Sequence, residues 1–116
     1  NLFVNDAIGY AMESEKTLKY SYNCFGCADA ISFNDEVLRI HDLKTGNGKV
    51  SFKQLDIYAA IFCLEYNYNP HNIHIEERIY QGRGYTISEP HPDDISEIME
   101  TIVLFDPIIE RLKYLV

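Results

Sequence analysis

Two aspartates and a lysine in the first half of the chain have the types and spacing needed to cleave a phosphodiester bond. Asp29 lies near the start of one predicted strand, Asp42 near the end of the next, and Lys44 two residues further on. Alternation along a strand turns Asp42 and Lys44 to the same face of the sheet. Magnesium is held by one or two carboxylates together with water and substrate phosphate. The bound cation acidifies a water molecule, which a lysine can orient or deprotonate. The set therefore predicts metal-dependent phosphodiester hydrolysis.

Each part of this pattern is weak when taken alone. Gly-x-x-Asp is common, and an Asp-x-Lys on a strand is more often a solvated charge pair than a site. The order and spacing of the parts, together with the helix predicted after them, favour a functional site.

The elements that must position these residues follow from the apolar periodicity of the chain. We expect the third and fourth strands, joined by a helix, to be parallel through a right-handed crossover. The prediction is an α/β domain, a mixed sheet flanked by helices in the order αβββαβ. Its expected helices are Leu2–Ser14, Ser51–Tyr66 and one from Pro92 that Pro107 kinks or splits, and its expected strands are Leu18–Tyr22, Ala28–Phe33, Val37–Leu43 and Ile73–Ile79.

Two polar residues stand out within the predicted strands. Glu77 falls in the same phase as Ile75 and Ile79, which requires a bulge or a polar partner. His41 neighbours Asp42 and so points to the opposite face, where packing is the favoured role.

Three ordered motifs then make a resemblance specific. The segments 26–29 (GCAD), 41–46 (HDLKTG) and 54–59 (QLDIYA) resemble the motifs of the RecB-like branch of the PD-(D/E)XK nucleases, which is similar in motif to the Cas4-like CRISPR-associated nucleases and to phage exonucleases. The resemblance covers about a third of the chain. It implies a restriction-endonuclease-like core and a DNA nuclease.

The resemblance also implies roles for individual residues. Asp29 and Asp42 would bind Mg²⁺ or Mn²⁺, with the carbonyl of Leu43 as a further ligand, and Lys44 would be the catalytic lysine. Gln54 and Tyr58 match the family's Gln-x-x-x-Tyr; four apart on a helix, they share a face and would contact DNA or brace the lysine. Surface packing beneath the sheet is the alternative for this pair.

Such nucleases also take an acidic residue or a histidine from an earlier helix. Glu15 and Glu13 are the candidates, and solvated charges at a helix end are the alternative. No histidine precedes His41, and the chain begins with Asn1, so we expect the native protein to have a further N-terminal segment.

The cysteines are Cys24, Cys27 and Cys63. A Cys-x-x-Cys pair suggests zinc or redox chemistry, but zinc requires two more ligands at similar spacing, and packing near a turn is favoured. Some of the nucleases that the chain resembles carry an iron–sulfur cluster held by cysteines, mainly in a C-terminal group. No cysteine follows Cys63 here, so no such cluster is expected.

The composition limits the classes of protein. The 116 residues form one predicted domain, 1–116, with 47% hydrophobic residues and no membrane-spanning run, and we expect a cytoplasmic protein, in the host cytoplasm if phage-encoded. A net charge of −8 argues against broad coating of duplex DNA. Basic residues near the expected site in sequence could still meet a DNA backbone: Lys49, Lys53, Arg78 and the loop Gly82-Arg83-Gly84. Nine Tyr and six Phe could include a base-stacking platform, although most must be core.

The leading prediction is a Mg²⁺- or Mn²⁺-dependent DNA exonuclease of phage or bacterial recombination, repair or end processing, working with a recombination partner or as a homo-oligomer. The alternatives are a non-catalytic nucleic-acid-binding or assembly subunit that keeps the nuclease fold, and a structure-specific endonuclease.

Overall fold

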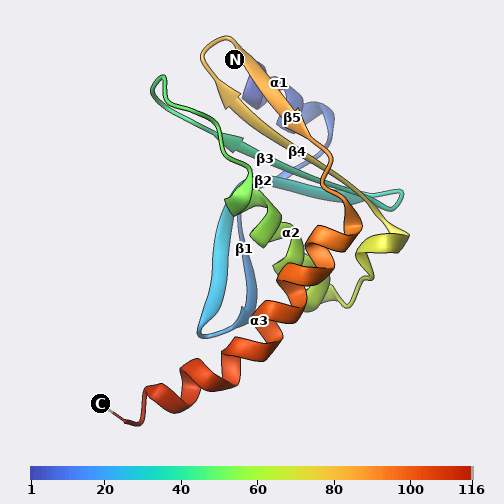
Figure 1. The fold of residues 1–116 in the computed structure, drawn as a ribbon. Helices are drawn as coiled ribbons and strands as arrows, with labels where there is room; N and C mark the ends of the chain where they lie inside the picture. The colour runs from blue at the N-terminus through green and yellow to red at the C-terminus, as the bar shows by residue number, and fades with distance from the viewer. Residues whose placement is uncertain (116) are drawn as a thin grey trace.

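The protein is an α/β domain built on one mixed five-stranded sheet (Figure 1), seen in a computed structural model that describes residues 1–115. The strands lie in chain order, β1-β2-β3-β4-β5. β3 and β4 are parallel, whereas every other neighbouring pair is antiparallel. The predicted fold class and the order αβββαβ are confirmed, with β5 and α3 following that core. The elements are α1 (Leu2–Gly9), β1 (Glu13–Ser21), β2 (Cys24–Asn34), β3 (Val37–Leu43), α2 (Lys53–Tyr66), the 3-10 turn Pro70–Asn72, β4 (His74–Gln81), β5 (Gly84–Ser88) and α3 (Pro92–Leu112).

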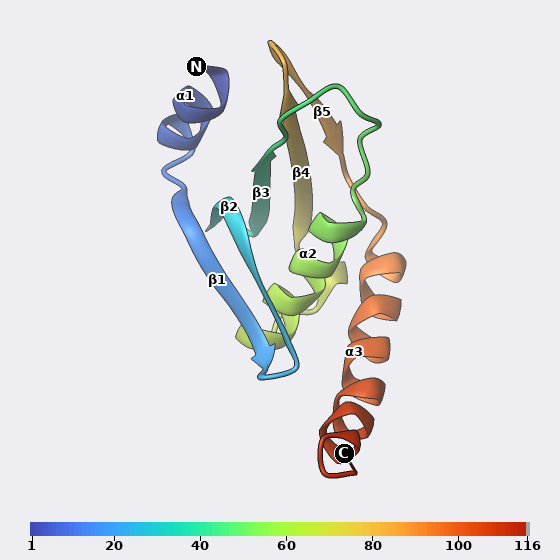
Figure 2. The ribbon, with the colours of Figure 1, turned by 90° about the vertical axis from the view of Figure 1, so that its left-hand side faces the viewer.

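Helices cover the two faces of the sheet unequally (Figure 2). α2 packs on one face and is itself covered by the first half of α3, whereas α1 lies against the other face. The apolar core is on the α2 side, where Ile40 and Leu55 are almost completely buried. The α1 side is polar and holds Arg78, Tyr80 and His41.

The N-terminal prediction was wrong in its boundaries. α1 ends at Gly9, and the left-handed φ of 52° at Ala11 turns the chain into a strand that begins at Glu13. Glu13 and Glu15 therefore lie on β1 and not on a helix. A second left-handed residue, Glu15 (φ 52°), interrupts the strand, so its alternation does not show as one continuous pattern.

The last hairpin was also missed. A two-residue turn at Gly82-Arg83 joins β4 to β5, with Gln81 opposite Gly84. Gly82 takes φ 62°, which suits glycine. The apolar residues of β5 remain exposed, so burial gives it no hydrophobic signature.

The two longer helices follow the sequence closely. The Ser51 hydroxyl accepts a hydrogen bond from the amide of Lys53 at the start of α2 (3.4 Å), and the left-handed Asn67 ends the helix. α3 runs through Pro107 without a break, so the predicted split does not occur.

The far half of α3 first passes the β1–β2 hairpin, where Asp106 and Glu110 accept hydrogen bonds from Ser21 and Asn23, and its last turns extend beyond the rest of the domain (Figure 1). The radius of gyration is 15.0 Å, compared with about 13 Å for a compact chain of this length. Several apolar side chains on this half are exposed, among them Leu104, Phe105, Ile109 and Leu112. None of the helices in residues 1–115 is both long enough and apolar enough to cross a membrane.

Candidate functional site

Asp29 and Asp42 lie side by side on neighbouring strands. The amide of Asp29 donates to Oδ1 of Asp42 (3.3 Å), and the amide of Leu43 donates to Oδ2 of Asp29 (2.9 Å). Ile31 pairs with Ile40, both in the core against α2. Alternation puts Asp29 and Asp42 on that same face. The structure thus brings the two predicted carboxylates together at one end of the β2–β3 pair.

Asp42 is partly buried, and its environment favours the neutral acid. Burial raises the pKa of Asp42 to about 6; the amide of Asp29 opposes this rise, and the Asp29 carboxylate adds to it. Two carboxylates this close stabilise a cation between them and repel each other without one.

Lys44 follows directly after β3 and is held by the loop that leads to α2. Its amide donates to the Tyr80 carbonyl (2.8 Å), which extends the pairing of β3 with β4. Its ammonium donates to the Lys49 carbonyl. Gln81 braces the same loop through Nε2, which donates to the carbonyls of Gly46 (2.8 Å) and Gly48 (3.1 Å). Among residues 1–115, Lys44 forms no ion pair with a carboxylate.

Gln54 and Tyr58 are placed differently on α2. Tyr58 is 8% exposed and lies close to the acidic pair: burial, then Asp42, raises the pKa of its hydroxyl. Gln54 is exposed on the first turn of the helix. Tyr58 also explains Gly26, because a Cβ there would lie 2.4 Å from Cε1 of its ring. The glycine of Gly-x-x-Asp thus makes room for the tyrosine of Gln-x-x-x-Tyr.

The two candidate glutamates differ in position. Ser14 pairs with Ala30 and Lys16 with Ala28, so the backbone of Glu15 lies opposite Asp29. Glu13 is the first residue of β1, opposite Ile31, and forms an ion pair with Lys16 (3.6 Å). Within residues 1–115 no group of three or more Asp, Glu, His or Cys side chains is arranged to hold a metal ion. Asp29 and Asp42 are the candidate metal ligands that lie next to each other in the described part of the chain.

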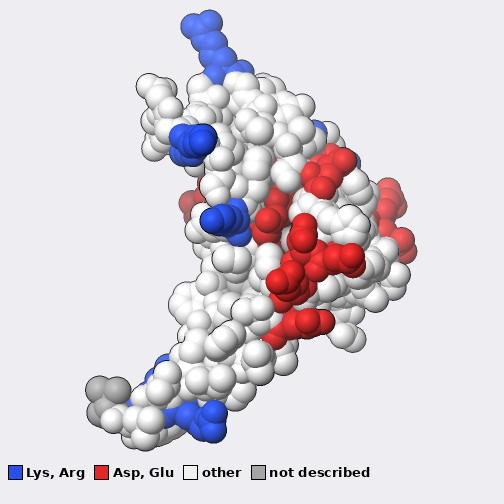
Figure 3. Space-filling view, viewed as in Figure 1, with Lys and Arg blue, Asp and Glu red and all other residues white. Residues whose placement is uncertain are grey.

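Basic side chains flank this end of the domain. Four of the ten Lys and Arg residues lie on the β3–α2 segment or the β4–β5 turn: Lys44, Lys49, Lys53 and Arg83. Figure 3 shows Lys and Arg side chains standing apart at this end, and Asp and Glu gathered further down the same face. The predicted role of Arg78 at a DNA backbone is wrong. It is 8% exposed on the α1 side, where it donates to Glu76 (2.8 Å) and to the Tyr10 hydroxyl (3.1 Å).

His41 is fully buried on the face opposite Asp42, between Tyr10 and Tyr80. Cys24 and Cys27 are free thiols on β2, one partly buried and one exposed. Asp56 was not predicted from the sequence: it lies beside Glu77 and is the polar neighbour that Glu77 required. The signal for it was a charged residue at a helical position that faces the sheet.

The fold and the site together define an α/β domain with two neighbouring carboxylates, each hydrogen-bonded to a backbone amide, at one end of a mixed sheet. The family model described as "Protein of unknown function (DUF2800)" matches residues 9–101, and the chain belongs to this family. A search of curated proteins returned no match. A crystal structure of a protein named SSO0001 is similar with a TM-score of 0.47 and 12% identity. The alignment covers 90% of this chain and 58% of that one, so the chain spans less than two thirds of its length.

Proposed function

We propose that this chain is the core of a Mg²⁺- or Mn²⁺-dependent DNA nuclease that resembles the RecB-like PD-(D/E)XK enzymes. The observation that carries the proposal is the hydrogen-bonded pair of Asp29 and Asp42, with Lys44 two residues beyond Asp42. We propose an exonuclease of phage or bacterial recombination, repair or end processing, acting in the cytoplasm.

The donor set suits a hard divalent cation. The hydrogen bonds described above use one oxygen of each carboxylate, Oδ1 of Asp42 and Oδ2 of Asp29. The second oxygen of each is left for a cation, and Mg²⁺ commonly takes one or two carboxylates and completes its shell with water and phosphate. A bound cation would supply an acidified water and offset the negative charge of the phosphate.

The residues of the chain would divide the remaining work. The amides of Asp29 and Leu43 hold the carboxylates in place, so that little reorganisation is needed when substrate binds. The loop carbonyl of Lys49 and the bracing by Gln81 position the ammonium of Lys44 beside the end of β3, where it would orient water or phosphate. Lys49, Lys53 and Arg83 would contact the DNA backbone.

Digestion of end-labelled linear DNA with Mg²⁺ or Mn²⁺ tests this proposal, run beside Lys44→Ala, Asp42→Asn and closed circular DNA. We expect metal-dependent loss of linear DNA only, and a fall of about a hundredfold or more in either variant, the scale of a lost acid–base group. Lys113→Ala and Asp35→Asn are the matched controls, because both change exposed residues away from the pair.

Other outcomes favour the alternatives. Cleavage of circular DNA would favour an endonuclease. A folded wild-type protein that is inert with both cations would overturn the catalytic proposal and favour the binding or assembly subunit.

A further inference from the structure

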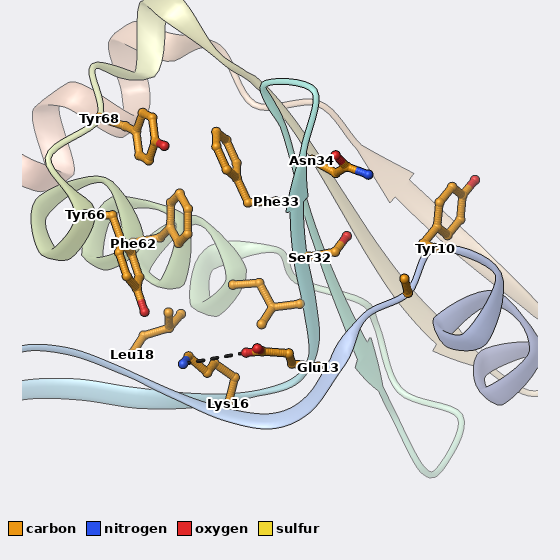
Figure 4. Close-up of a pocket in the computed structure, with 12 residues that line it drawn as sticks. Tyr10, Glu13, Lys16, Leu18, Ser32, Phe33, Asn34, Phe62, Tyr66 and Tyr68 are labelled. Atoms are coloured by element: carbon orange, nitrogen blue, oxygen red, sulfur yellow. Dashed lines mark ion pairs between the residues drawn. The ribbon is translucent and has the colours of Figure 1, made fainter.

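A cavity of about 400 Å³ opens beside β1 and β2, at the far end of β2 from the carboxylate pair (Figure 4). It lies where β1 begins, beside the last residues of β2 and the end of α2. Ile31 and Phe33 line it, and because side chains two residues apart on a strand share a face, both lie on the same face of β2 as Asp29. Phe33 lies four residues beyond Asp29, which is about 13 Å along a strand.

One wall of the cavity is aromatic. Phe33 packs on Tyr68 with ring centroids 4.6 Å apart, and Phe62 packs on Tyr66 at 4.9 Å. Tyr66 and Tyr68 remain 43% and 37% exposed, although they adjoin the core. Aromatic rings at the mouth of a cavity offer faces on which a flat apolar ring can stack.

The opposite side of the cavity is polar. Glu13 and Lys16 form their ion pair there, and Ser32 and Asn34 line the cavity from the other side of β2, where they point away from Phe33 and toward Tyr10 (Figure 4). The Ser32 hydroxyl is buried without a hydrogen-bond partner among the described residues. These groups supply both donors and acceptors, whereas a purely apolar ligand would leave all of them unused.

The sheet also has an open edge at this point. The pairing of β1 with β2 begins at Glu13 opposite Ile31, whereas β2 continues to Asn34. Beyond Ile31, β2 has only β3 as a neighbour in the sheet. A ligand can therefore enter from the side.

We propose that this cavity holds an unpaired base of a single DNA strand whose backbone runs along β2 toward Asp29 and Asp42. The inference rests on the proposed function and specifies its substrate as single-stranded DNA or a frayed end. The base stacks on the aromatic wall and hydrogen-bonds to the polar side, and Lys16 lies near its phosphate. A paired base would first have to leave its stack and its partner, which costs a few kcal/mol, so the cavity favours a base that is already unpaired.

The charge of the protein is consistent with binding by stacking. A net charge of −8 leaves little affinity from phosphate neutralisation. Because Lys16 is the cation lining the cavity, binding should depend weakly on salt: the slope of log K against log salt is about −0.7 for one phosphate contact on a single strand.

Binding of a fluorescent oligothymidylate about ten nucleotides long tests the inference, using anisotropy with Lys44→Ala protein in EDTA so that no strand is cut. An abasic strand of the same length is the second probe. We expect the abasic strand to bind more weakly, and Tyr66→Ala to weaken oligothymidylate binding by about 5- to 150-fold, the range for one lost stacking partner. Tyr66→Phe should keep most of the affinity. Tyr114→Ala, which removes an 81% exposed tyrosine outside the cavity, is the matched control, and circular dichroism confirms the fold of each variant.

Equal affinity for the two probes, an unchanged affinity in Tyr66→Ala, or no binding by the folded protein would each overturn the inference. The nuclease proposal can fail separately. If binding depends on the base and on Tyr66 but the protein cuts no DNA, the nuclease proposal is wrong and the base site stands. If Tyr66→Ala cuts DNA and binds it with full affinity, the base site is wrong and the nuclease proposal stands.

Discussion

Glu77 is a carboxyl group at a position where the pattern of β4 calls for an apolar residue. It is completely buried, and neither of its oxygens meets a hydrogen-bond donor among residues 1–115; the same is true of Oδ1 of Asp56 on α2. Two carboxyl groups in contact are satisfied only when they share a proton. Burial, and next the neighbouring Asp56, raises the pKa of Glu77 to about 10 from an ordinary value of 4.5. The side chain is therefore a neutral acid at pH 7.

Glu77→Gln should stabilise the protein increasingly as the pH rises. The folded state keeps a proton that the unfolded chain releases above pH 4.5, so wild-type stability declines from there toward pH 10. Glutamine has no proton to lose, and its advantage at pH 8 should be on the order of a few kcal/mol. Urea unfolding at a series of pH values measures it, with the exposed Glu36→Gln as control. Parallel curves for wild type and Glu77→Gln would show that Glu77 ionises normally.

The sequence revealed the acidic pair more readily than its surroundings. Asp29, Asp42 and Lys44 lie within sixteen residues of one another, where strand alternation and a hairpin fix their relation. The contact of Asp56 with Glu77 and the residues of the cavity could not be predicted, because these contacts join segments that are far apart in the chain. Lys16 and Tyr66, for example, meet only after β1 and α2 pack together.

At the scale of elements, β2 packs against α2 at the point where Gly26 faces the ring of Tyr58. A Cβ at Gly26 would also lie 3.0 Å from Cδ1 of Tyr58, and the buried ring has little room to move. Strand and helix can therefore approach this closely only if position 26 has no side chain.

Gly26→Ala should displace Tyr58 from its place beside Asp42. We expect a loss of about 1–3 kcal/mol in the free energy of unfolding, the usual scale of overpacking, together with reduced DNA cleavage. Gly9→Ala is the matched control, because a Cβ there meets nothing within 4 Å. Chemical denaturation and the cleavage assay measure the two effects. A Gly26→Ala protein as stable and as active as Gly9→Ala would contradict the packing argument.

Elements with a regular period were predictable, and those with special backbone geometry were not. β3 was predicted with its observed bounds and α2 within two residues, because their apolar patterns are uninterrupted. The start of β1 was missed because left-handed residues at Ala11 and Glu15 break its alternation. Pro107 does not end α3. Asp106 and Glu110, on either side of the proline, accept hydrogen bonds from Ser21 and Asn23 of the β1–β2 hairpin, and these bonds hold this part of the helix against the domain.

At the scale of the whole molecule, a cation at the carboxylate pair should stabilise the fold whether or not DNA is cut. Mg²⁺ or Mn²⁺ at about ten times its Kd adds about 1.4 kcal/mol by mass action, which is roughly a 4–8 °C rise in Tm for a domain of this size. Thermal melts with and without EDTA measure the rise. Asp42→Asn should abolish it and Asp35→Asn should keep it. Equal rises in wild type and Asp42→Asn would place the cation elsewhere.

The strict chain order of the strands also has a consequence for how the protein folds. Hairpins between consecutive strands close short loops and form quickly, whereas a parallel pair must first close a long one. β1, β2 and β3 form one such unit, and β4 with β5 form another. Within the sheet, the parallel β3–β4 ladder joins the two units, and α2 lies between them in the chain. Asp29 and Asp42 both belong to the first unit. The loop that holds Lys44 is braced by Gln81, which belongs to the second. We therefore expect the two acids to meet early in folding, and the lysine to reach its place only when the two halves of the sheet join.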